Sequence, residues 1–103
     1  MEEIKRIINS ELREYNVTST RILLFGSRAK GTFDEDSDYD ILIVLNEDIS
    51  DELKIKLSCI ITRELSNNWV NADIIVKSNS ELKYYENCIG SVVRQALLEG
   101  VSV

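Results

Sequence analysis

The segment from Arg21 to Leu45 limits the possible folds more than any other part of this 103-residue chain. Its first apolar run, Ile22–Phe25, stops at a Gly-Ser pair, and a second apolar run follows two aspartates and ends at Leu45. Short, unbroken apolar runs are typical of strands that are covered on both faces. Gly26 permits a sharp turn after the first run. We therefore expect a strand, a tight turn into a short helix, and a second strand.

The remaining segments predict one small domain of helices packed on a sheet. Three segments have the helical spacing of apolar residues, and one more apolar run has the length of a strand. These are residues 2–15, 50–67 and 80–99 for the helices, with Ser50 as an N-cap, and Ala72–Val76 for the strand. Trp69 is expected to anchor the connector before this strand, and Gly90 leaves a break in the last helix open. The expected fold class is α/β (α+β), with a small mixed sheet of three or four strands, as a single domain over residues 1–103.

Composition excludes several classes of function. The formal charge of −6 disfavours an extended nucleic-acid surface, because such surfaces are basic. The absence of histidine removes the usual zinc sites and histidine-based proton transfer, so catalysis would depend on carboxylates. No apolar run reaches the roughly 20 residues of a membrane helix. Cys59 and Cys88 are expected to be reduced and buried, which together with the N-terminal sequence favours a cytoplasmic protein.

The turn after the first strand has features of an anion site. Ser27 is expected to cap the short helix, and free backbone N–H groups at a helix start attract anions. Arg28 and Lys30 follow closely, so they become plausible phosphate contacts. The alternative is that Gly26 and Ser27 only end the strand, and that both cations are solvated.

Three aspartates lie at strand ends in apolar surroundings. Asp38 and Asp40 would project from one face of the second strand, because side chains alternate along a strand. Two adjacent carboxylates repel each other, and Mg²⁺ would remove that penalty while bridging to phosphate oxygens. Asp73 lies near the start of the third strand, either at an exposed end or in a site. The residues themselves leave open that all three are simply solvated.

The spacing from Gly26-Ser27 to Asp38-Tyr39-Asp40 resembles the signature of the DNA polymerase beta-like nucleotidyltransferase superfamily. The stretch GSRAKGTFDEDSDYDILIV is similar to that of the minimal nucleotidyltransferases, the small MntA-type proteins of bacteria and archaea. The likeness covers about residues 20–78. It implies the nucleotidyltransferase fold, with ATP as substrate and two Mg²⁺ ions as cofactors.

The resemblance also implies a role for each matching residue. Asp38, Asp40 and Asp73 would hold the metal ions and be catalytic, with Asp73 also activating the acceptor hydroxyl. The nucleotide-binding residues would be those of the turn and its surroundings: Gly26, Ser27, Arg28, Lys30 and Ser37. The acceptor oxygen would attack the α-phosphorus and release pyrophosphate.

Minimal members of this family typically pair with a small helical HEPN protein in toxin–antitoxin systems. The resemblance therefore implies an antitoxin that transfers AMP to a hydroxyl, expected to be a tyrosine, of a HEPN toxin. Two alternatives stay open: a binding antitoxin that neutralises its partner without catalysis, and transfer to an RNA 3′ end. The nucleotide base, the acceptor and the formation of a homodimer are left open by the sequence.

Overall fold

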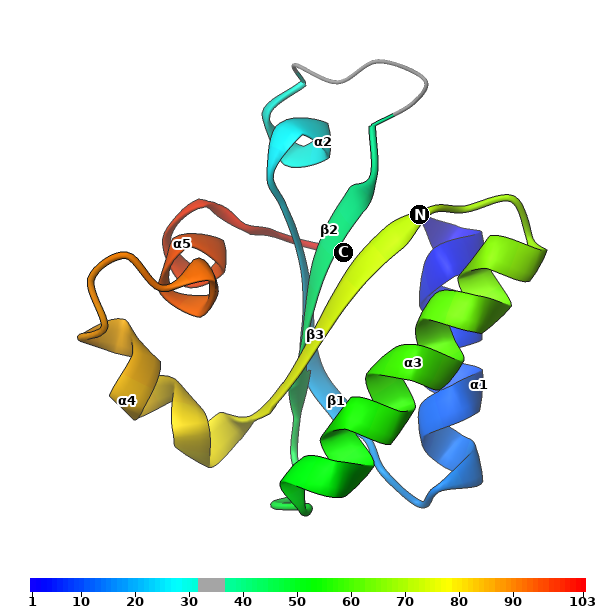
Figure 1. Cartoon of the computed structure of the whole chain (residues 1–103), viewed down its shortest axis with the longest axis horizontal. Helices are drawn as coiled ribbons and strands as arrows, with labels where there is room; N and C mark the ends of the chain where they lie inside the picture. Colours follow the sequence, from blue (N-terminus) through cyan, green and yellow to red (C-terminus); the bar gives the residue numbers. More distant parts are fainter. Residues whose placement is uncertain (32–36) are drawn as a thin grey trace.

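A mixed four-stranded sheet forms the centre of the protein in the computed structural model, which describes residues 1–31 and 37–103. The strands lie in the order β3-β2-β1-β4 (Figure 1). β2 is parallel to β3 and antiparallel to β1, and β4 is antiparallel to β1. Their bounds are Ser19–Phe25 for β1, Tyr39–Leu45 for β2, Ala72–Ser78 for β3 and Val101–Ser102 for β4. The predicted α/β (α+β) fold class is confirmed. The mixed sheet was expected to have three or four strands, and it has four.

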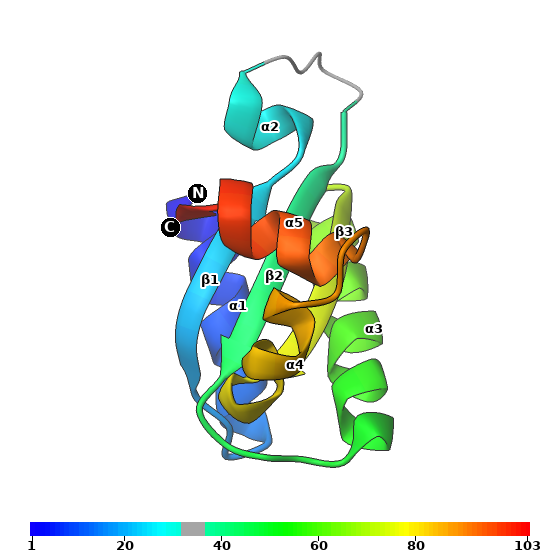
Figure 2. The same ribbon diagram turned by 90° about the vertical axis from the view of Figure 1, so that its left-hand side faces the viewer.

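Helices cover both faces of this sheet. Figure 1 shows α1 and α3 on one side and α4 and α5 on the other, with the short α2 at one end of the molecule. In the turned view of Figure 2, α5 crosses in front of β1 and β2. The helices are α1 Glu2–Glu14, α2 Ser27–Lys30, α3 Asp51–Asn67, the 3₁₀ turn η1 Asn79–Glu81, α4 Leu82–Glu86 and α5 Val92–Glu99.

The apolar run of β2 is buried on both faces, as its sequence predicts. Ile41, Ile43 and Leu45 face the core formed with α1 and α3, whereas Leu42 and Val44 face the core formed with α4 and α5. All five side chains are fully buried. A strand covered on both sides needs apolar residues at every position, which explains the loss of alternation in this run.

The predicted start of α3 is confirmed in detail. Ser50 is the N-cap, and its Oγ accepts a hydrogen bond from the backbone N–H of Leu53 at 3.1 Å. This bond satisfies one of the amides that has no partner within the helix. Asp51 and Glu52 in the first turn add favourable interactions with the helix dipole.

The single C-terminal helix expected over residues 80–99 is wrong. The segment forms η1, α4 and α5, and Gly90 adopts a φ of +87° in the turn between α4 and α5. This left-handed conformation is easily reached by glycine, which explains where the break falls. The break also leaves Ile89 89% exposed, although helical spacing assigned it to the core.

Two other expectations about burial are wrong. Trp69 is 96% exposed and does not anchor its connector. Cys59 is exposed and Cys88 is only half-buried, although both are free thiols as expected. Apolar character alone does not decide burial, because Trp69 follows the end of α3 and Cys59 lies within α3 but outside its row of buried residues. The acidic turn expected around residues 32–36 lies outside the described part of the chain.

No helix within the described residues is both long and apolar enough to cross a membrane.

Candidate functional site

The structure brings the three predicted aspartates to one end of the sheet. Asp40 in β2 and Asp73 in β3 are direct register partners on neighbouring parallel strands. Asp38 lies immediately before β2. Strand alternation puts Asp40 in the row of Leu42 and Asp73 in the row of Ile75, and both rows face the core under α4 and α5. The two strands therefore present their carboxylates on the same face.

The three carboxylates influence one another electrostatically. Burial raises the pKa of Asp40, and the negative charges of Asp73 and Asp38 raise it further. Asp40 is half-buried, whereas Asp38 and Asp73 are exposed. Like charges held together disfavour ionisation, so a cation bound at this end of the sheet would favour the ionised form of Asp40.

The turn after β1 comes close to the three aspartates at Gly26. A Cβ atom at this position would lie 2.2 Å from Oδ2 of Asp40. The residue also has a φ of +73°, in the region that favours glycine. Both observations require glycine here, because any side chain would displace the Asp40 carboxylate.

The expectation that Ser27 caps α2 is wrong. Gly26 occupies the N-cap position, and Ser27 is the first residue of the helix. The reason is the positive φ of Gly26, which completes the turn one residue earlier than an extended serine cap would. Ser27 still follows the turn directly and is half-buried.

Arg28 and Ser37 are joined to each other. Nε and Nη2 of Arg28 donate to the backbone carbonyl of Ser37 at 3.2 and 3.0 Å. The guanidinium also lies over the ring of Tyr39, 4.3 Å from the ring centroid. Arg28 thus bridges from α2 to both neighbours of Asp38. Sequence reasoning did not single out Tyr39, and the aromatic residue between two aspartates was the available signal.

Lys30, the other expected nucleotide contact, pairs with α5. Its Nζ lies 3.3 Å from Oε2 of Glu99, and both side chains are about half exposed. This ion pair links the C-terminal end of α2 to the C-terminal end of α5. The geometry thus directs Lys30 toward α5 in this state of the protein.

The donor set suits a magnesium ion. Carboxylate oxygens are the ligands that Mg²⁺ prefers. Burial, and then the negative charges of Asp73 and Asp38, raise the pKa of Asp40, and a bound cation would oppose both effects. Within the described ranges, however, no three acidic side chains are already gathered at metal-binding distances. Mg²⁺ usually keeps several waters and shares substrate phosphates, so a complete protein cage is not required.

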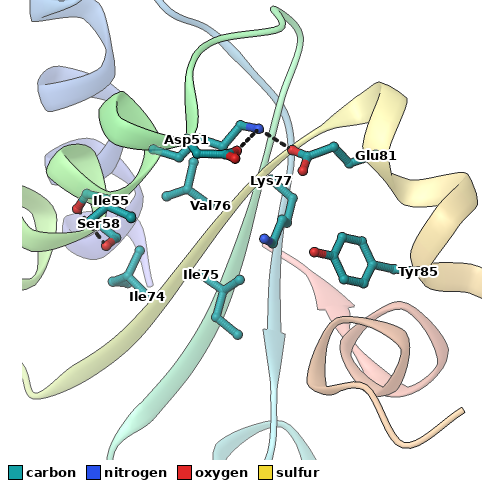
Figure 3. Close-up of a pocket in the computed structure, with 10 residues that line it drawn as sticks. Asp51, Ile55, Ser58, Ile74, Ile75, Val76, Lys77, Glu81 and Tyr85 are labelled. Atoms are coloured by element: carbon teal, nitrogen blue, oxygen red, sulfur yellow. Dashed lines mark hydrogen bonds and ion pairs between the residues drawn. The ribbon is translucent and has the colours of Figure 1, made fainter. Parts of the chain in front are cut away.

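A separate polar cluster lies in a groove of about 430 Å³ between α3 and α4, along the outer side of β3. Figure 3 shows Asp51 and Glu81 joined by dashed lines to one ammonium group, that of Lys54. Lys54 is only 8% exposed. Sequence reasoning missed this cluster, although Ser78 and Glu81 have the Ser-x-x-Glu spacing of a capping box.

Comparison with known proteins agrees with this geometry. The family model described as "Nucleotidyltransferase domain" matches residues 2–102. "Putative protein adenylyltransferase MJ0141" of Methanocaldococcus jannaschii is 40% identical over 47 residues, which are 46% of this chain and 44% of that protein. "Putative protein adenylyltransferase MJ0604" of the same organism is 46% identical over 41 residues, 40% of this chain and 41% of that protein. These alignments span less than half of either relative.

Three solved structures share the fold. A "putative nucleotidyltransferase from Sulfolobus solfataricus" superposes with a TM-score of 0.61 at 22% identity, over 95% of this chain and 73% of that chain. A chain from "the toxin-antitoxin with AMP-PNP" gives 0.58 at 22% identity, over 95% and 70%. A chain from "tri-AMPylated Shewanella oneidensis HEPN toxin in complex with MNT antitoxin" gives 0.56 at 17% identity, over 98% and 69%. At these identities the likeness shows the fold alone.

Proposed function

Because the chain belongs to the nucleotidyltransferase domain family, we propose that it transfers AMP from ATP to a hydroxyl group in a Mg²⁺-dependent reaction. The observation that carries this proposal is the registered pair of Asp40 and Asp73, with Asp38 beside it and Gly26 against the Asp40 carboxylate. A carboxylate such as Asp40, whose pKa is raised by burial and by two neighbouring aspartates, is a candidate for a functional site.

The turn at Gly26 and Ser27 would receive the triphosphate. The hydroxyl of Ser27 and the backbone amides at the start of α2 are donors for phosphate oxygens. Gly26 has no side chain, so the phosphates can approach the backbone beside Asp40. The triphosphate is anionic and so is the site, so the nucleotide requires added cations.

Two Mg²⁺ ions held by Asp38, Asp40 and Asp73 would supply that charge and neutralise the attacking and leaving oxygens. Asp73 accepts the proton of the acceptor hydroxyl. The freed oxygen forms a bond to the α-phosphorus, and the bond between this phosphorus and the bridging oxygen breaks to release pyrophosphate. The remaining contribution of the chain is to hold the reacting groups in line.

The acceptor would be a tyrosine of a HEPN-domain partner, with this chain acting as the antitoxin. Solved structures of the same fold come from a toxin–antitoxin complex with AMP-PNP and from an AMPylated HEPN toxin with its MNT antitoxin. The formal charge of −6 favours a protein acceptor over RNA, because an RNA acceptor would be repelled.

The test mixes the protein with ATP, Mg²⁺ and the product of its neighbouring gene, and measures an AMP adduct by intact-protein mass spectrometry. Asp38→Asn and Asp40→Asn are expected to abolish the adduct. Asp51→Asn is the matched control, because Asp51 lies in the Lys54 groove. Absence of an adduct with the unaltered protein would refute the proposal.

Two further arms separate the alternatives. If the Asp40→Asn protein silences the partner fully without ATP, neutralisation occurs by binding. If labelled ATP modifies tRNA and not the partner protein, the acceptor is an RNA end. Either result would contradict transfer to a protein hydroxyl as the antitoxin mechanism.

A further inference from the structure

Arg28 has an unusual place for a residue that would be expected to contact phosphate. It is the second residue of α2, and its side chain is half-buried. Two of its nitrogens converge on one carbonyl, that of Ser37, and the flat guanidinium lies 4.3 Å from the centroid of the Tyr39 ring. Ser37 and Tyr39 are the two residues that flank Asp38. The side chain therefore holds the chain on both sides of the first carboxylate.

This contact connects the two halves of the site. Gly26 and α2 follow β1, whereas Asp38 and Asp40 introduce β2. Figures 1 and 2 both show α2 beside the beginning of β2 at the same end of the molecule. Apart from the chain itself, Arg28 supplies a direct link between α2 and this strand entrance.

The link extends to the third carboxylate. The backbone N–H of Tyr39 donates to the carbonyl of Asn71 at 2.9 Å, immediately before β3. In the parallel pairing of β2 with β3, Tyr39 lies opposite Ala72, and the following pair is Asp40 opposite Asp73. A side chain that restrains Ser37 and Tyr39 therefore restrains the position of Asp40 against Asp73.

We propose that Arg28 is a positioning residue, which holds Asp38 and Asp40 against the Gly26 turn, and that a phosphate contact is not its main role. The consequence for catalysis rests on the proposed nucleotidyl transfer, whereas the structural restraint does not. The role needs a planar fork that donates through two nitrogens and lies flat on an aromatic ring, whereas lysine has a single nitrogen and no planar group.

The first test needs no catalysis. Hydrogen exchange, measured by mass spectrometry, should become faster in peptides covering residues 37–41 in Arg28→Ala and Arg28→Lys, and remain unchanged in α3. Tyr39→Leu should produce the same change, whereas Tyr39→Phe, which keeps the ring, should not. Arg6→Ala is the control for lost charge, because Arg6 lies in an exposed pair with Glu3. Unchanged exchange at residues 37–41 in both Arg28 variants would overturn the proposal.

A second measurement also avoids turnover. Mn²⁺ titration without nucleotide, followed by electron paramagnetic resonance, reports how well the carboxylates are placed for a divalent ion. Arg28→Lys keeps the positive charge, so a purely electrostatic role predicts unchanged Mn²⁺ affinity. The positioning role predicts an affinity that is about 10-fold weaker, the size found for other residues that orient metal ligands. Equal affinity in Arg28→Lys and the unaltered protein would contradict it.

Kinetics then separate positioning from phosphate binding. Arg28→Lys and Arg28→Ala are expected to lower kcat for AMP transfer by about 10- to 100-fold, with the KM for ATP changed less than about twofold. If Arg28→Lys keeps the kcat of the unaltered protein and Arg28→Ala raises the KM for ATP, the main role of Arg28 is to bind phosphate. That result would overturn the proposal. If even the unaltered protein transfers no AMP, the proposed function fails, and hydrogen exchange and Mn²⁺ affinity still decide the role of Arg28.

Discussion

Replacing Glu81 with glutamine is expected to lower the free energy of unfolding by about 3 kcal/mol at neutral pH. Oε1 of Glu81 accepts hydrogen bonds from Nζ of Lys54 at 2.5 Å and from the backbone N–H and Oγ of Ser78, both at 2.9 Å. The Glu81→Gln change preserves the shape and an acceptor for Ser78. It removes one of the two negative charges that face the buried ammonium of Lys54, and leaves the more exposed carboxylate of Asp51 at 3.3 Å.

The magnitude follows from the pKa of Glu81. Burial by itself would raise this pKa, but hydrogen bonds from Lys54 and Ser78 outweigh it and lower the value from 4.5 to about 2. A lowering of this size corresponds to about 3 kcal/mol of stability when the carboxylate is ionised. Removal of one partner from a buried ion pair typically costs about 3–5 kcal/mol, which agrees.

The sign of the pH dependence follows from the same shift. A carboxylate whose folded pKa is lowered contributes its full stability above the unfolded value of 4.5. This contribution is lost as the pH falls from 4.5 toward the folded value of about 2. Glu81→Gln should lack this part of the acid dependence, so the two proteins should converge in stability at low pH.

Urea denaturation followed by far-ultraviolet circular dichroism is the appropriate assay. Trp69 is 96% exposed, so its fluorescence is a poor reporter of unfolding. The exposed pair of Glu3 with Arg6 provides the control, and Glu3→Gln should produce no measurable change. The double variant Lys54→Met/Glu81→Gln should lose less than the sum of its single changes, because it removes the buried ammonium together with its more buried partner. A loss below about 0.5 kcal/mol in Glu81→Gln, or strict additivity, would refute the reasoning.

Three further predictions concern the acidic end of the sheet. Asp40→Asn should stabilise the Mg²⁺-free protein at neutral pH, because burial and the charges of Asp73 and Asp38 raise the pKa of Asp40 and so disfavour its ionised form. In thermal melts, the gain in stability should shrink as the pH falls through the raised pKa of Asp40. Equal melting temperatures of the two proteins at neutral pH would contradict this prediction. The same variant should lower the rate of AMP transfer by more than about 100-fold, because loss of a metal ligand costs more than loss of a residue that only orients a ligand. Gly26→Ala should lose both stability and activity, because its Cβ would meet Oδ2 of Asp40. Gly90→Ala is the control, because Gly90 has a similar positive φ but open space where a Cβ would lie. This variant should lower the free energy of unfolding by about 1 kcal/mol, measured by urea denaturation, and leave activity unchanged. Equal activity loss in the two alanine variants would argue against crowding at Asp40.

Several site features could be predicted because they depend on local chemistry. The buried run of β2 follows from its unbroken apolar sequence, and alternation along the strand puts Asp40 in the row of Leu42 and Val44. The Ser50 cap was likewise predictable from its position before an acidic helical turn. The cap at Ser27 was predicted incorrectly, because the positive φ of Gly26 ends the turn one residue earlier.

Contacts between distant segments could not be predicted in the same way. The sequence around Lys54 indicates an ordinary solvated charge on α3. Lys54 is buried, however, where η1 brings Glu81 against it, beside its helix neighbour Asp51. Ile89 reads as a core residue of a helix, yet the turn at Gly90 leaves it exposed. In both cases burial was decided by which segments meet in space, and periodicity carries no information about that.

By itself the sequence determined the parts that depend on neighbouring residues: the positions of β1, β2 and β3, the turn at Gly26, and the face of β2 on which Asp40 projects. Only the tertiary structure decided that β3 lies parallel to β2 with Asp73 opposite Asp40, and that Arg28 reaches across to Ser37 and Tyr39. The physical reason is that side-chain alternation fixes a face within a strand. The neighbouring strand and its register depend instead on how helices and strands far apart in the chain bury their apolar surfaces together.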